Sequence, residues 1–180
     1  MIDDKLLVAQ LKNVKTQELA FRNLMSLYKK RLYWHIRKIV ISHEDADDVL
    51  QNTFIKVFKN IHKFNEDSQL YSWMYRIATN ESITFINNKA KKQQVNINDL
   101  QYQLADELSN DSYFSGDEIQ QKLQKAIITL PRKQQLVFNM KYFDDMKYSD
   151  MSEILETSVG ALKASYFHAV KKIEQHLKSN

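Results

Sequence analysis

Apolar residues recur at helical spacing along three long segments in the first half of the chain. The first follows Thr16, an expected helix N-cap. The second opens at Ser42, where Asp45 three residues later resembles a capping box, and the third follows Ser68. Because residues three and four apart share one face of a helix, the pattern predicts three amphipathic helices. The positions expected to face inward are Leu19, Phe21, Leu24, Leu27, Tyr28, Leu32, Ile36, Ile39 and Val40 in the first helix, Ala46, Val49, Leu50, Phe54, Val57, Phe58 and Ile61 in the second, and Leu70, Trp73, Met74, Ile77, Ile83 and Ile86 in the third.

Shorter segments with the same periodicity follow residue 117. Pro131 ends the first of them and suits the first turn of the next, where a missing N–H costs nothing. The inward positions here are Ile119, Leu123, Ala126, Ile127 and Leu130, then Leu136, Val137, Met140 and Phe143. Since the chain has only two Gly, one Pro and no Cys, it is predicted to be all-α and free of disulfides.

Charge separates these two sets of segments. Residues 1–92 hold 16 Lys or Arg and 10 Asp or Glu, residues 93–119 hold six acids and no Lys or Arg, and residues 120–180 hold 10 basic and six acidic residues. Residues 93–116 also have poor periodicity and are rich in Asn, Asp, Gln and Ser, as linkers are. The scattered apolar residues of this segment, such as Ile97, Leu100 and Leu104, indicate that it docks transiently or forms a short helix. The sequence therefore predicts two small helical domains, 1–92 and 117–180, joined by an acidic linker at 93–116.

The stretch YSDMSEILETSVGALKASYFHAVKKI, residues 148–173, predicts a helix-turn-helix. Ser149 is expected to cap a short helix, residues 156–158 to form a tight turn, and Ser158 to cap the next helix. The inward side of that next helix consists of Leu162, Tyr166, Ala169 or Val170, Ile173 and Leu177. Its outward side carries Gly160, Ala161, Lys163, Ala164, Phe167, His168 and Lys171.

Gly160 has two interpretations. Together with Ala161 and Ala164, it leaves room for the helix end to approach a DNA groove and its phosphates. Alternatively, the segment is a plain helical hairpin with glycine at a crowded packing contact.

The first domain carries two features that are typical of binding surfaces. Asp47, Asp48 and Gln51 follow the expected start of the second helix, and residues three apart share a face. The alternative is an acid cluster that only stabilises the start of its helix. Tyr71 and Tyr75 are four apart and fall off the stripe of the third helix, so they are expected to face outward, as a surface that stacks single-stranded bases requires. The residues that can donate hydrogen bonds to bases and phosphates are Asn80, Asn87, Asn88, Lys89 and Lys91.

The sequence disfavours an enzyme. No two of the five His residues are four apart, as in an i, i+4 ligand pair accompanied by a carboxylate, and there is no Gly-rich phosphate loop. We therefore predict no catalytic residue, no metal site, no cofactor and no small-molecule substrate. No apolar run approaches the ~20 residues of a membrane span. The opening MIDDKLLVAQ does not resemble a signal peptide, which predicts a cytoplasmic protein.

Two stretches together resemble bacterial sigma factors of the sigma-70 family, in particular the extracytoplasmic-function (ECF) group. HEDADDVLQNTFIKVFKNIHKFNEDSQLYSWMYRIATN is similar to sigma region 2, and ITLPRKQQLVFNMKYFDDMKYSDMSEILETSVGALKASYFHAVKKIEQHL is similar to region 4. The likeness covers about residues 16–92 and 120–178, in the family's order and with a linker between them. It implies a protein that binds core RNA polymerase and directs promoter recognition, DNA melting and transcription initiation.

The resemblance also implies roles for single residues. Asp47, Asp48 and Gln51 would contact the clamp helices of the largest polymerase subunit. Residues 71–88 would melt and read the −10 element as single-stranded DNA, with Asn80 near the loop that captures a flipped base. The candidate −10 contacts are Tyr71, Tyr75, Asn80, Asn87, Asn88, Lys89 and Lys91. The candidate −35 contacts are Arg132, Lys133, Ser158, Lys163, Ala164, Phe167, His168 and Lys171.

The chain departs from the family at several of these positions. Members often carry arginine where this chain has Ala164, Ser165 and His168, and an acid where it has Asn52. The expected partners are core polymerase and promoter DNA, as duplex and as melted strand, with an anti-sigma protein as a further candidate. The main alternative is a helix-turn-helix regulator that binds duplex DNA as a dimer without polymerase, and it does not account for the features of the first domain. A purely structural interaction protein is the third interpretation, and it predicts no salt-sensitive DNA affinity.

Overall fold

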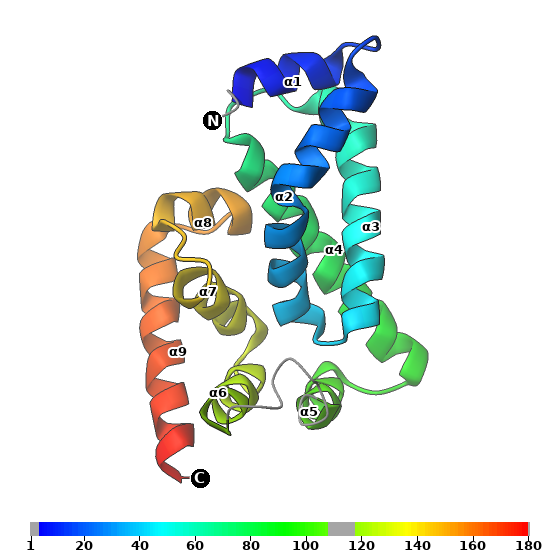
Figure 1. Cartoon of the computed structure of the whole chain (residues 1–180). Coiled ribbons are helices and arrows are strands. Elements are labelled where there is room, and N and C mark those ends of the chain that lie inside the picture. The colour runs from blue at the N-terminus through cyan, green and yellow to red at the C-terminus, as the bar shows by residue number, and fades with distance from the viewer. Residues whose placement is uncertain (1–3, 108–117, 180) are drawn as a thin grey trace. The chain divides into compact units, whose positions relative to one another are not determined.

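The computed structural model describes residues 4–107 and 118–179, and within these ranges the chain is built from helices without strands (Figure 1). The predicted all-α fold class is confirmed. The chain divides into two compact units, one formed by residues 1–83 with 153–155 and the other by residues 84–152 with 156–180. The expected domain boundary at residues 116 and 117 lies outside the described residues, and the domain limits stay predictions.

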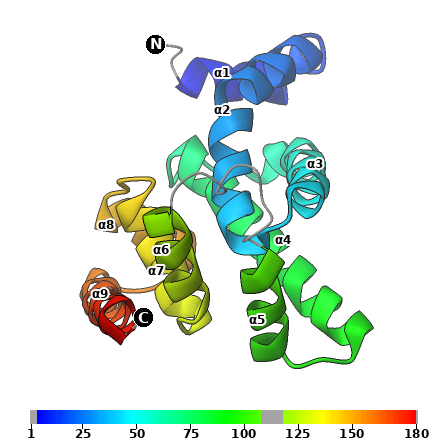
Figure 2. The same cartoon turned by 60° about the horizontal axis from the view of Figure 1, so that its bottom comes forward.

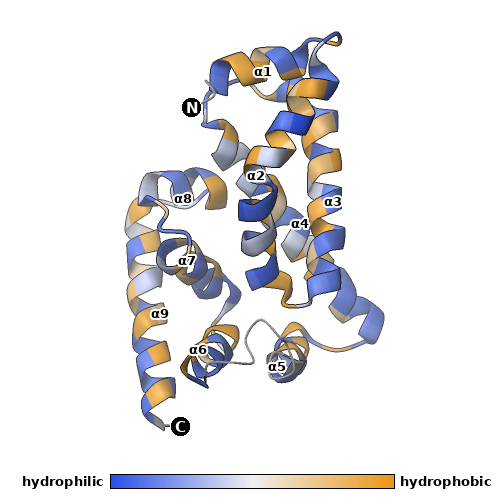
Figure 3. Ribbon diagram, viewed as in Figure 1, coloured by the Kyte–Doolittle hydropathy of each residue, from blue (hydrophilic) through white to orange (hydrophobic). Residues whose placement is uncertain are grey.

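The first unit contains α1 (Asp4–Lys12), α2 (Gln17–Val40), α3 (His43–Asn60), a 3-10 turn (Ile61–Lys63) and most of α4 (Leu70–Gln93). A two-residue connection joins α2 to α3, so the two helices lie antiparallel and side by side (Figures 1 and 2). Figure 3 shows apolar and polar residues alternating along α3, as its sequence predicted. The buried residues of α2 and α3 include Leu24, Leu32, Ile36, Ala46, Val49, Phe54 and Val57.

The two expected N-caps of this unit differ in outcome. Ser42 caps α3 as predicted, because its hydroxyl accepts a hydrogen bond from the Asp45 N–H at 3.4 Å. Thr16 occupies the N-cap position of α2 without a side-chain cap. Its hydroxyl donates instead to the Gln10 carbonyl at 2.8 Å, which closes the turn between α1 and α2.

Three apolar side chains that were expected to face inward are exposed, and that part of the prediction is wrong. Leu19 and Leu27 lie on the solvent side of α2, and Phe58 is only partly covered by the Phe21 ring, whose centroid is 5.0 Å away. Helical periodicity predicts which side of a helix is apolar, but it does not say how wide a strip the neighbouring helices cover.

Polar side chains interrupt the apolar interior side of α4, which the sequence pattern did not predict. Ser72, Thr79 and Ser82 are buried, and α4 continues unbroken through residues 79–82. Thr79 and Ser82 each donate a hydrogen bond to the carbonyl four residues earlier, at 2.8 Å. The Thr79 and Ser82 hydroxyls therefore have acceptors within their own helix, which removes most of the cost of burying them, whereas the buried Ser72 Oγ has no hydrogen-bond partner among the described residues.

Tyr75 is the main correction in this helix. It was expected to face outward, but its side chain is 1% exposed and its ring centroid lies 4.8 Å from that of buried His35. Tyr71 is half-buried, with the Arg31 guanidinium 6.0 Å from its ring centroid. Trp73, which was expected in the core, is also only half-buried and packs on Phe64 with ring centroids 5.2 Å apart.

The second unit contains the end of α4, α5 (Ile97–Glu107), α6 (Glu118–Ile128), α7 (Arg132–Tyr142), α8 (Tyr148–Leu155) without its last three residues, and α9 (Val159–Ser179). Helices α6 and α7 pack against α9, and the three lie together in both views (Figures 1 and 2). Their core consists of Ala126, Ile127, Leu130, Phe138, Ala169 and Ile173. Ile119 and Leu177, both expected inward, are exposed near the ends of α6 and α9.

Helix α5 occupies part of the segment that was expected to be a linker. Gln94 adopts a left-handed conformation with φ 56°, and the Val95 N–H donates to the Ala90 carbonyl at 3.1 Å, so a regular C-terminal turn ends α4. Asn96 then caps α5, since its side-chain oxygen accepts from the Asp99 N–H at 2.8 Å. Local capping therefore organises this segment despite its weak periodicity.

Helices α8 and α9 form the predicted helix-turn-helix. Glu156 ends α8 in a left-handed conformation, and Ser158 caps α9 by accepting from the Ala161 N–H at 3.3 Å. The expected cap at Ser149 is wrong, because α8 begins one residue earlier and Ser149 lies inside its first turn. Polar and apolar residues alternate along α9 in Figure 3, and Leu162 is buried as predicted.

Candidate nucleic-acid and partner interfaces

A groove of about 620 Å³ runs between α2 and α3 in the first unit. Asp47, Asp48 and Gln51 line it, and all three are exposed. The structure thus places the three predicted polymerase contacts together on one surface. The sequence pattern did not predict the apolar part of the groove, which is lined by Phe21, Met25, Leu50, Phe54, Ile55 and Phe58. The apolar pair Ile55 and Phe58 could have indicated this apolar surface, but Phe58 had been counted as a core residue.

The acids at the start of α3 divide into two kinds. Asp45 is half-buried and lies near Arg37, whose guanidinium is buried. Burial lowers the pKa of Arg37, while the hydrogen-bonded Tyr33 and the charge of Asp45 act in the opposite direction. Asp45 therefore has a structural role beside the buried Arg37 guanidinium. Asp47 and Asp48 are exposed, and the Asp47 carboxylate lies 3.7 Å from His43 Nε2.

The outer face of α4 carries the amides and lysines that were predicted to contact the melted strand. Asn80, Asn87 and Lys91 are exposed and follow one another at intervals of seven and four residues, which keeps them on one stripe of the helix. Asn88 is exposed beside this stripe, whereas Lys89 is half-buried. The face is therefore a row of hydrogen-bond donors.

Trp73 is the aromatic side chain that shares this face, since it lies seven residues before Asn80. Tyr75 lies on the opposite side and supports the helix from within. The Thr79 hydroxyl already donates to the Tyr75 carbonyl, so it accepts from His35 Nε2–H at 2.8 Å. Buried Tyr75, Thr79 and His35 thus hold α4 against α2 beneath the candidate strand-binding face.

The outer face of α9 presents the predicted duplex contacts together. Lys163, Ala164, Phe167, His168 and Lys171 are all exposed, and the Lys171 ammonium lies 4.5 Å from the Phe167 ring centroid. A Cβ built on Gly160 would meet no atom within 4 Å. The alternative of a glycine at a crowded packing contact is therefore wrong, and the start of α9 is open to an approaching molecule.

The remaining predicted duplex contacts lie near the starts of α7 and α9. Lys133 and Ser158 are exposed, but Arg132 is partly covered, and burial lowers the pKa of its guanidinium. Lys141 and Tyr148 were not among the predicted contacts. The ammonium groups of Lys141 and Lys163 each lie 5.8 Å from the Tyr148 ring centroid. These three residues lie on different helices and are brought together only by the fold, so their spacing in the sequence did not predict this cluster.

Other kinds of site find no support in the described part of the chain. Residues 4–107 and 118–179 hold no group of three or more His, Cys, Asp or Glu side chains arranged to bind a metal ion. Within the same ranges, no helix combines the length and the apolar character that crossing a bilayer requires.

Two family models match this chain. Sigma-70 region 2 matches residues 24–92, and Sigma-70 region 4 matches residues 120–173. The first match contains α3 and nearly all of α4, and the second contains the helix-turn-helix. Together the two matches cover more than half of the chain.

Several curated proteins are similar over nearly the whole length. The ECF RNA polymerase sigma factor SigW of Bacillus subtilis is 25% identical over 167 residues, which are 88% of this chain and 89% of that protein. The ECF RNA polymerase sigma-E factor of Haemophilus influenzae is 25% identical over 166 residues, 88% of this chain and 87% of that protein. The sigma-E factor of Escherichia coli K12 is 24% identical over 181 residues, 96% of this chain and 93% of that protein.

Solved structures share the fold. CnrH, in complex with the cytosolic domain of CnrY, has a TM-score of 0.70 at 20% identity and covers 98% of both chains. The sigma factor RpoE of Bartonella quintana, in complex with the anti-sigma factor NepR, has a TM-score of 0.67 at 18% identity and covers 88% of this chain and 96% of that one. On the two family matches, in this order and supported by these relatives, the chain belongs to the ECF group of the sigma-70 family of RNA polymerase sigma factors.

Proposed function

We propose that this protein is an ECF-type sigma factor that binds core RNA polymerase and directs promoter recognition, DNA melting and transcription initiation. One observation carries the proposal. The chain that holds a helix-turn-helix also presents two further surfaces, the groove between α2 and α3 and the amide-rich face of α4. A regulator that only binds duplex DNA needs neither of them.

The groove between α2 and α3 is the proposed polymerase-binding surface. Exposed Asp47, Asp48 and Gln51 offer charged and amide groups, and the apolar side chains beside them offer area to bury. Interfaces commonly combine an apolar centre with polar groups that fix orientation. This arrangement suits a helical segment of the polymerase that carries both basic and apolar residues.

The outer face of α4 is the proposed −10 surface. Asn80 and Asn87 can hydrogen-bond the exposed edges of unpaired bases, and Lys91 can bind the strand backbone. Trp73 provides the aromatic surface on which a base can stack, whereas half-buried Tyr71 lies beside Tyr75, with ring centroids 6.0 Å apart. We assign buried Tyr75 a supporting role in place of the stacking role that the sequence suggested.

The outer face of α9 is the proposed −35 surface. Exposed Phe167 and His168 lie where a recognition helix reads base edges, and Lys163 and Lys171 lie where phosphates pass. Lys141 and Tyr148 join Lys163 to extend the phosphate-facing side. Lys133 and the partly covered Arg132 are candidates at the start of α7.

Three further assignments follow from this proposal. The protein acts as a non-catalytic polymerase subunit, and it works in the cytoplasm, where polymerase is found. An anti-sigma protein is a candidate partner, because the two similar solved structures are complexes with the cytosolic domain of CnrY and with the anti-sigma factor NepR.

Reconstituted transcription tests the proposal. Core polymerase mixed with this protein should start transcripts at defined positions, on promoters selected from genomic DNA, and core alone should not. The double variant Asp48→Arg, Gln51→Ala should lose core binding in a pull-down and keep its helical circular dichroism, since truncating contacts at a desolvated interface costs a few kcal/mol. The matched control is Glu18→Arg, which changes an exposed acid of α2 outside the groove. Sequence-specific duplex binding without core binding would instead identify a helix-turn-helix regulator.

A further inference from the structure

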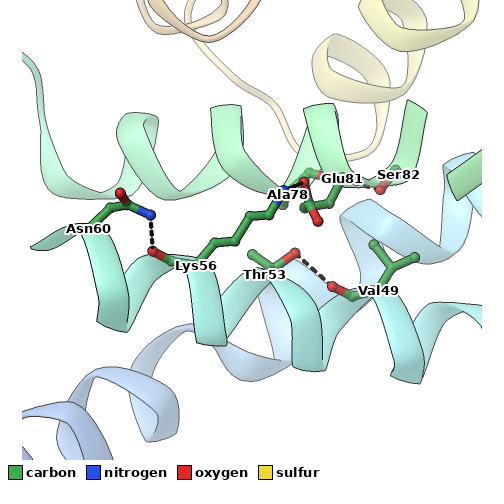
Figure 4. Close-up of polar contacts among 7 residues, drawn as sticks. All are labelled: Val49, Thr53, Lys56, Asn60, Ala78, Glu81 and Ser82. Atoms are coloured by element: carbon green, nitrogen blue, oxygen red, sulfur yellow. Dashed lines mark hydrogen bonds and ion pairs between the residues drawn. The ribbon is translucent and has the colours of Figure 1, made fainter. Parts of the chain in front are cut away.

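An ion pair joins α3 to α4 at the edge of the candidate strand-binding face. The Lys56 ammonium donates to the Glu81 carboxylate, and Figure 4 shows the lysine side chain reaching across from one helix to the other. The two side chains differ in exposure, 53% for Lys56 and 15% for Glu81. An approaching strand therefore meets the ammonium of Lys56, while most of the Glu81 carboxylate is covered.

The neighbouring hydroxyl groups form their hydrogen bonds with other partners and not with this ion pair. Thr53 and Ser82 are fully buried, and each hydroxyl donates to a carbonyl of its own helix, Val49 and Ala78 respectively, at 2.8 Å (Figure 4). In the described part of the chain, Lys56 is the hydrogen-bond partner of Glu81. The Asn60 side chain also donates to the Lys56 carbonyl at 2.9 Å, which fixes the last turns of α3.

The pair lies directly beside a predicted base contact. Glu81 follows Asn80 in α4, and successive residues of a helix point about 100° apart. Asn80 therefore faces outward, while Glu81 lies on the flank toward α3 and brings the Lys56 ammonium to the side of Asn80. A lysine that is already held in place loses less conformational freedom when it makes a further contact.

The chemistry of the pair narrows what it can bind. An ammonium group has three donors and no acceptor, so one donor serves Glu81 and the others require acceptor oxygens. The positive charge is offset by the carboxylate, so the pair adds little to the general attraction of DNA phosphates. We propose that Glu81 is a positioning residue that holds Lys56 beside Asn80, and that Lys56 determines specificity by donating to one acceptor oxygen of the unpaired strand.

This inference rests on the proposed function and adds residues that the sequence pattern did not single out. The competing explanation is a surface ion pair that only links two helices, and exposed pairs of this kind are worth little. The two explanations differ in one measurable quantity, the ratio of affinities for a matched and a mismatched strand.

The test uses the protein bound to core polymerase. A matched single strand is first selected by the wild-type holoenzyme from a random oligonucleotide pool, and a scrambled strand of equal length serves as the mismatch. Glu81→Gln should tighten binding to both strands, because it removes a negative charge, yet reduce the matched-to-mismatched ratio about fivefold, the value of a typical net hydrogen bond. Glu18→Gln is the matched control, since it also removes one acid from an ion pair, with Arg22, and should leave the ratio unchanged.

A second pair of variants keeps the result interpretable. Lys56→Met should weaken binding to both strands and also reduce the ratio, because it removes the donor and exposes an uncompensated acid. The double variant Lys56→Met, Glu81→Gln should regain general affinity but not the ratio. A wild-type ratio in all three variants would overturn the proposal and leave a merely structural ion pair.

Two modified strands identify the acceptor oxygen. Replacing single phosphates by neutral methylphosphonates removes a backbone acceptor, and base analogues without a carbonyl oxygen remove a base acceptor. One substitution of either kind should weaken wild-type binding several-fold and have no effect on Lys56→Met, and that substitution names the source. If no substitution distinguishes the two proteins, Lys56 does not contact the strand and the proposal fails. A failure of the wild-type holoenzyme to select any strand would instead count against the proposed function.

Discussion

Helices α4 and α9 both carry an exposed face of candidate DNA contacts, but they rest on different interiors. Helix α9 packs through apolar Leu162, Ala169 and Ile173. Helix α4 packs partly through Tyr75, Thr79 and Ser82, all of which carry a hydroxyl. The comparison shows that an exposed helix face can be supported by an apolar layer or by a layer that includes buried hydroxyls with acceptors inside the protein.

This difference explains why the sequence predicted one face better than the other. In α9 the apolar residues recur at helical spacing, so the side that remains outside was predicted correctly for Lys163, Phe167 and Lys171. In α4 the same rule predicted that Tyr75 faces outward and Trp73 inward, whereas Tyr75 is buried and Trp73 is half-buried. Periodicity counts a tyrosine or threonine as polar, although such a residue can be buried when its partner lies on another helix.

The largest expected effect tests the polar interior directly. Tyr75→Ala should lower the free energy of unfolding of the full-length protein by about 3–5 kcal/mol, because it removes a fully buried ring. Urea denaturation followed by far-ultraviolet circular dichroism measures this. The matched change in α9 is Phe167→Ala, whose ring is 55% exposed and which should cost about 0.5 kcal/mol or less.

The same pair of variants separates folding from DNA binding. Phe167→Ala should retain stability and shift the sequence preference for the −35 duplex, whereas Tyr75→Ala should weaken all functions of the first unit together. If Tyr75→Ala were as stable as wild type and lost only promoter opening, the ring would be a strand contact and the polar-interior interpretation of α4 would be wrong.

Local capping explains which helix starts could be predicted from the sequence. Ser42 and Ser158 were predicted as caps because a serine stands directly before a strongly periodic segment. Asn96 caps α5 in the same way, but because the periodicity after it is weak, the sequence left a short helix and transient docking as alternatives there. The sequence predicted Asp47 and Asp48 as candidate surface contacts of α3, but it did not predict the apolar groove beside them and it counted Phe58 as core. Sequence spacing does not predict contacts between different helices, because these contacts depend on the fold. Examples are the contacts of Tyr148 with Lys141 and Lys163 and the ion pair of Lys56 with Glu81.

A smaller effect isolates one hydrogen bond of the α4 interior. Thr79→Val keeps the shape of the side chain but removes the oxygen that accepts from His35 Nε2 at 2.8 Å. Losing a buried partner should cost about 1–3 kcal/mol, measured by urea denaturation. Thr84→Val is the control on the same helix, since Thr84 is exposed and its change should alter stability by about 0.5 kcal/mol or less. Equal stability of the two variants would show that the buried hydroxyl contributes nothing.

The smallest expected effect compares what the two faces bind. Phosphates of duplex DNA hold more condensed counterions than those of a single strand, so each lost contact changes the salt dependence of binding by about 0.9 on duplex and about 0.7 on a single strand. Lys163→Ala or Lys171→Ala should therefore lower the salt slope of holoenzyme binding to a −35 duplex by about 0.9, and Lys91→Ala should lower the slope for a −10 single strand by about 0.7. Fluorescence anisotropy at several salt concentrations measures both.

Two lysines calibrate this last comparison. Lys15 is exposed in the turn between α1 and α2 and is not one of the candidate DNA contacts, so Lys15→Ala should leave both slopes unchanged. Lys56 should behave almost like Lys15 in the slope, because the Glu81 carboxylate offsets its charge, while differing from it in strand specificity. A slope change of Lys56→Ala as large as that of Lys91→Ala would mean that the ion pair opens when the strand binds, and the ammonium would then act on a phosphate as a full charge. Identical slopes for Lys91→Ala and Lys15→Ala would remove the outer face of α4 from the strand path and leave α9 as the sole DNA-binding face among those compared.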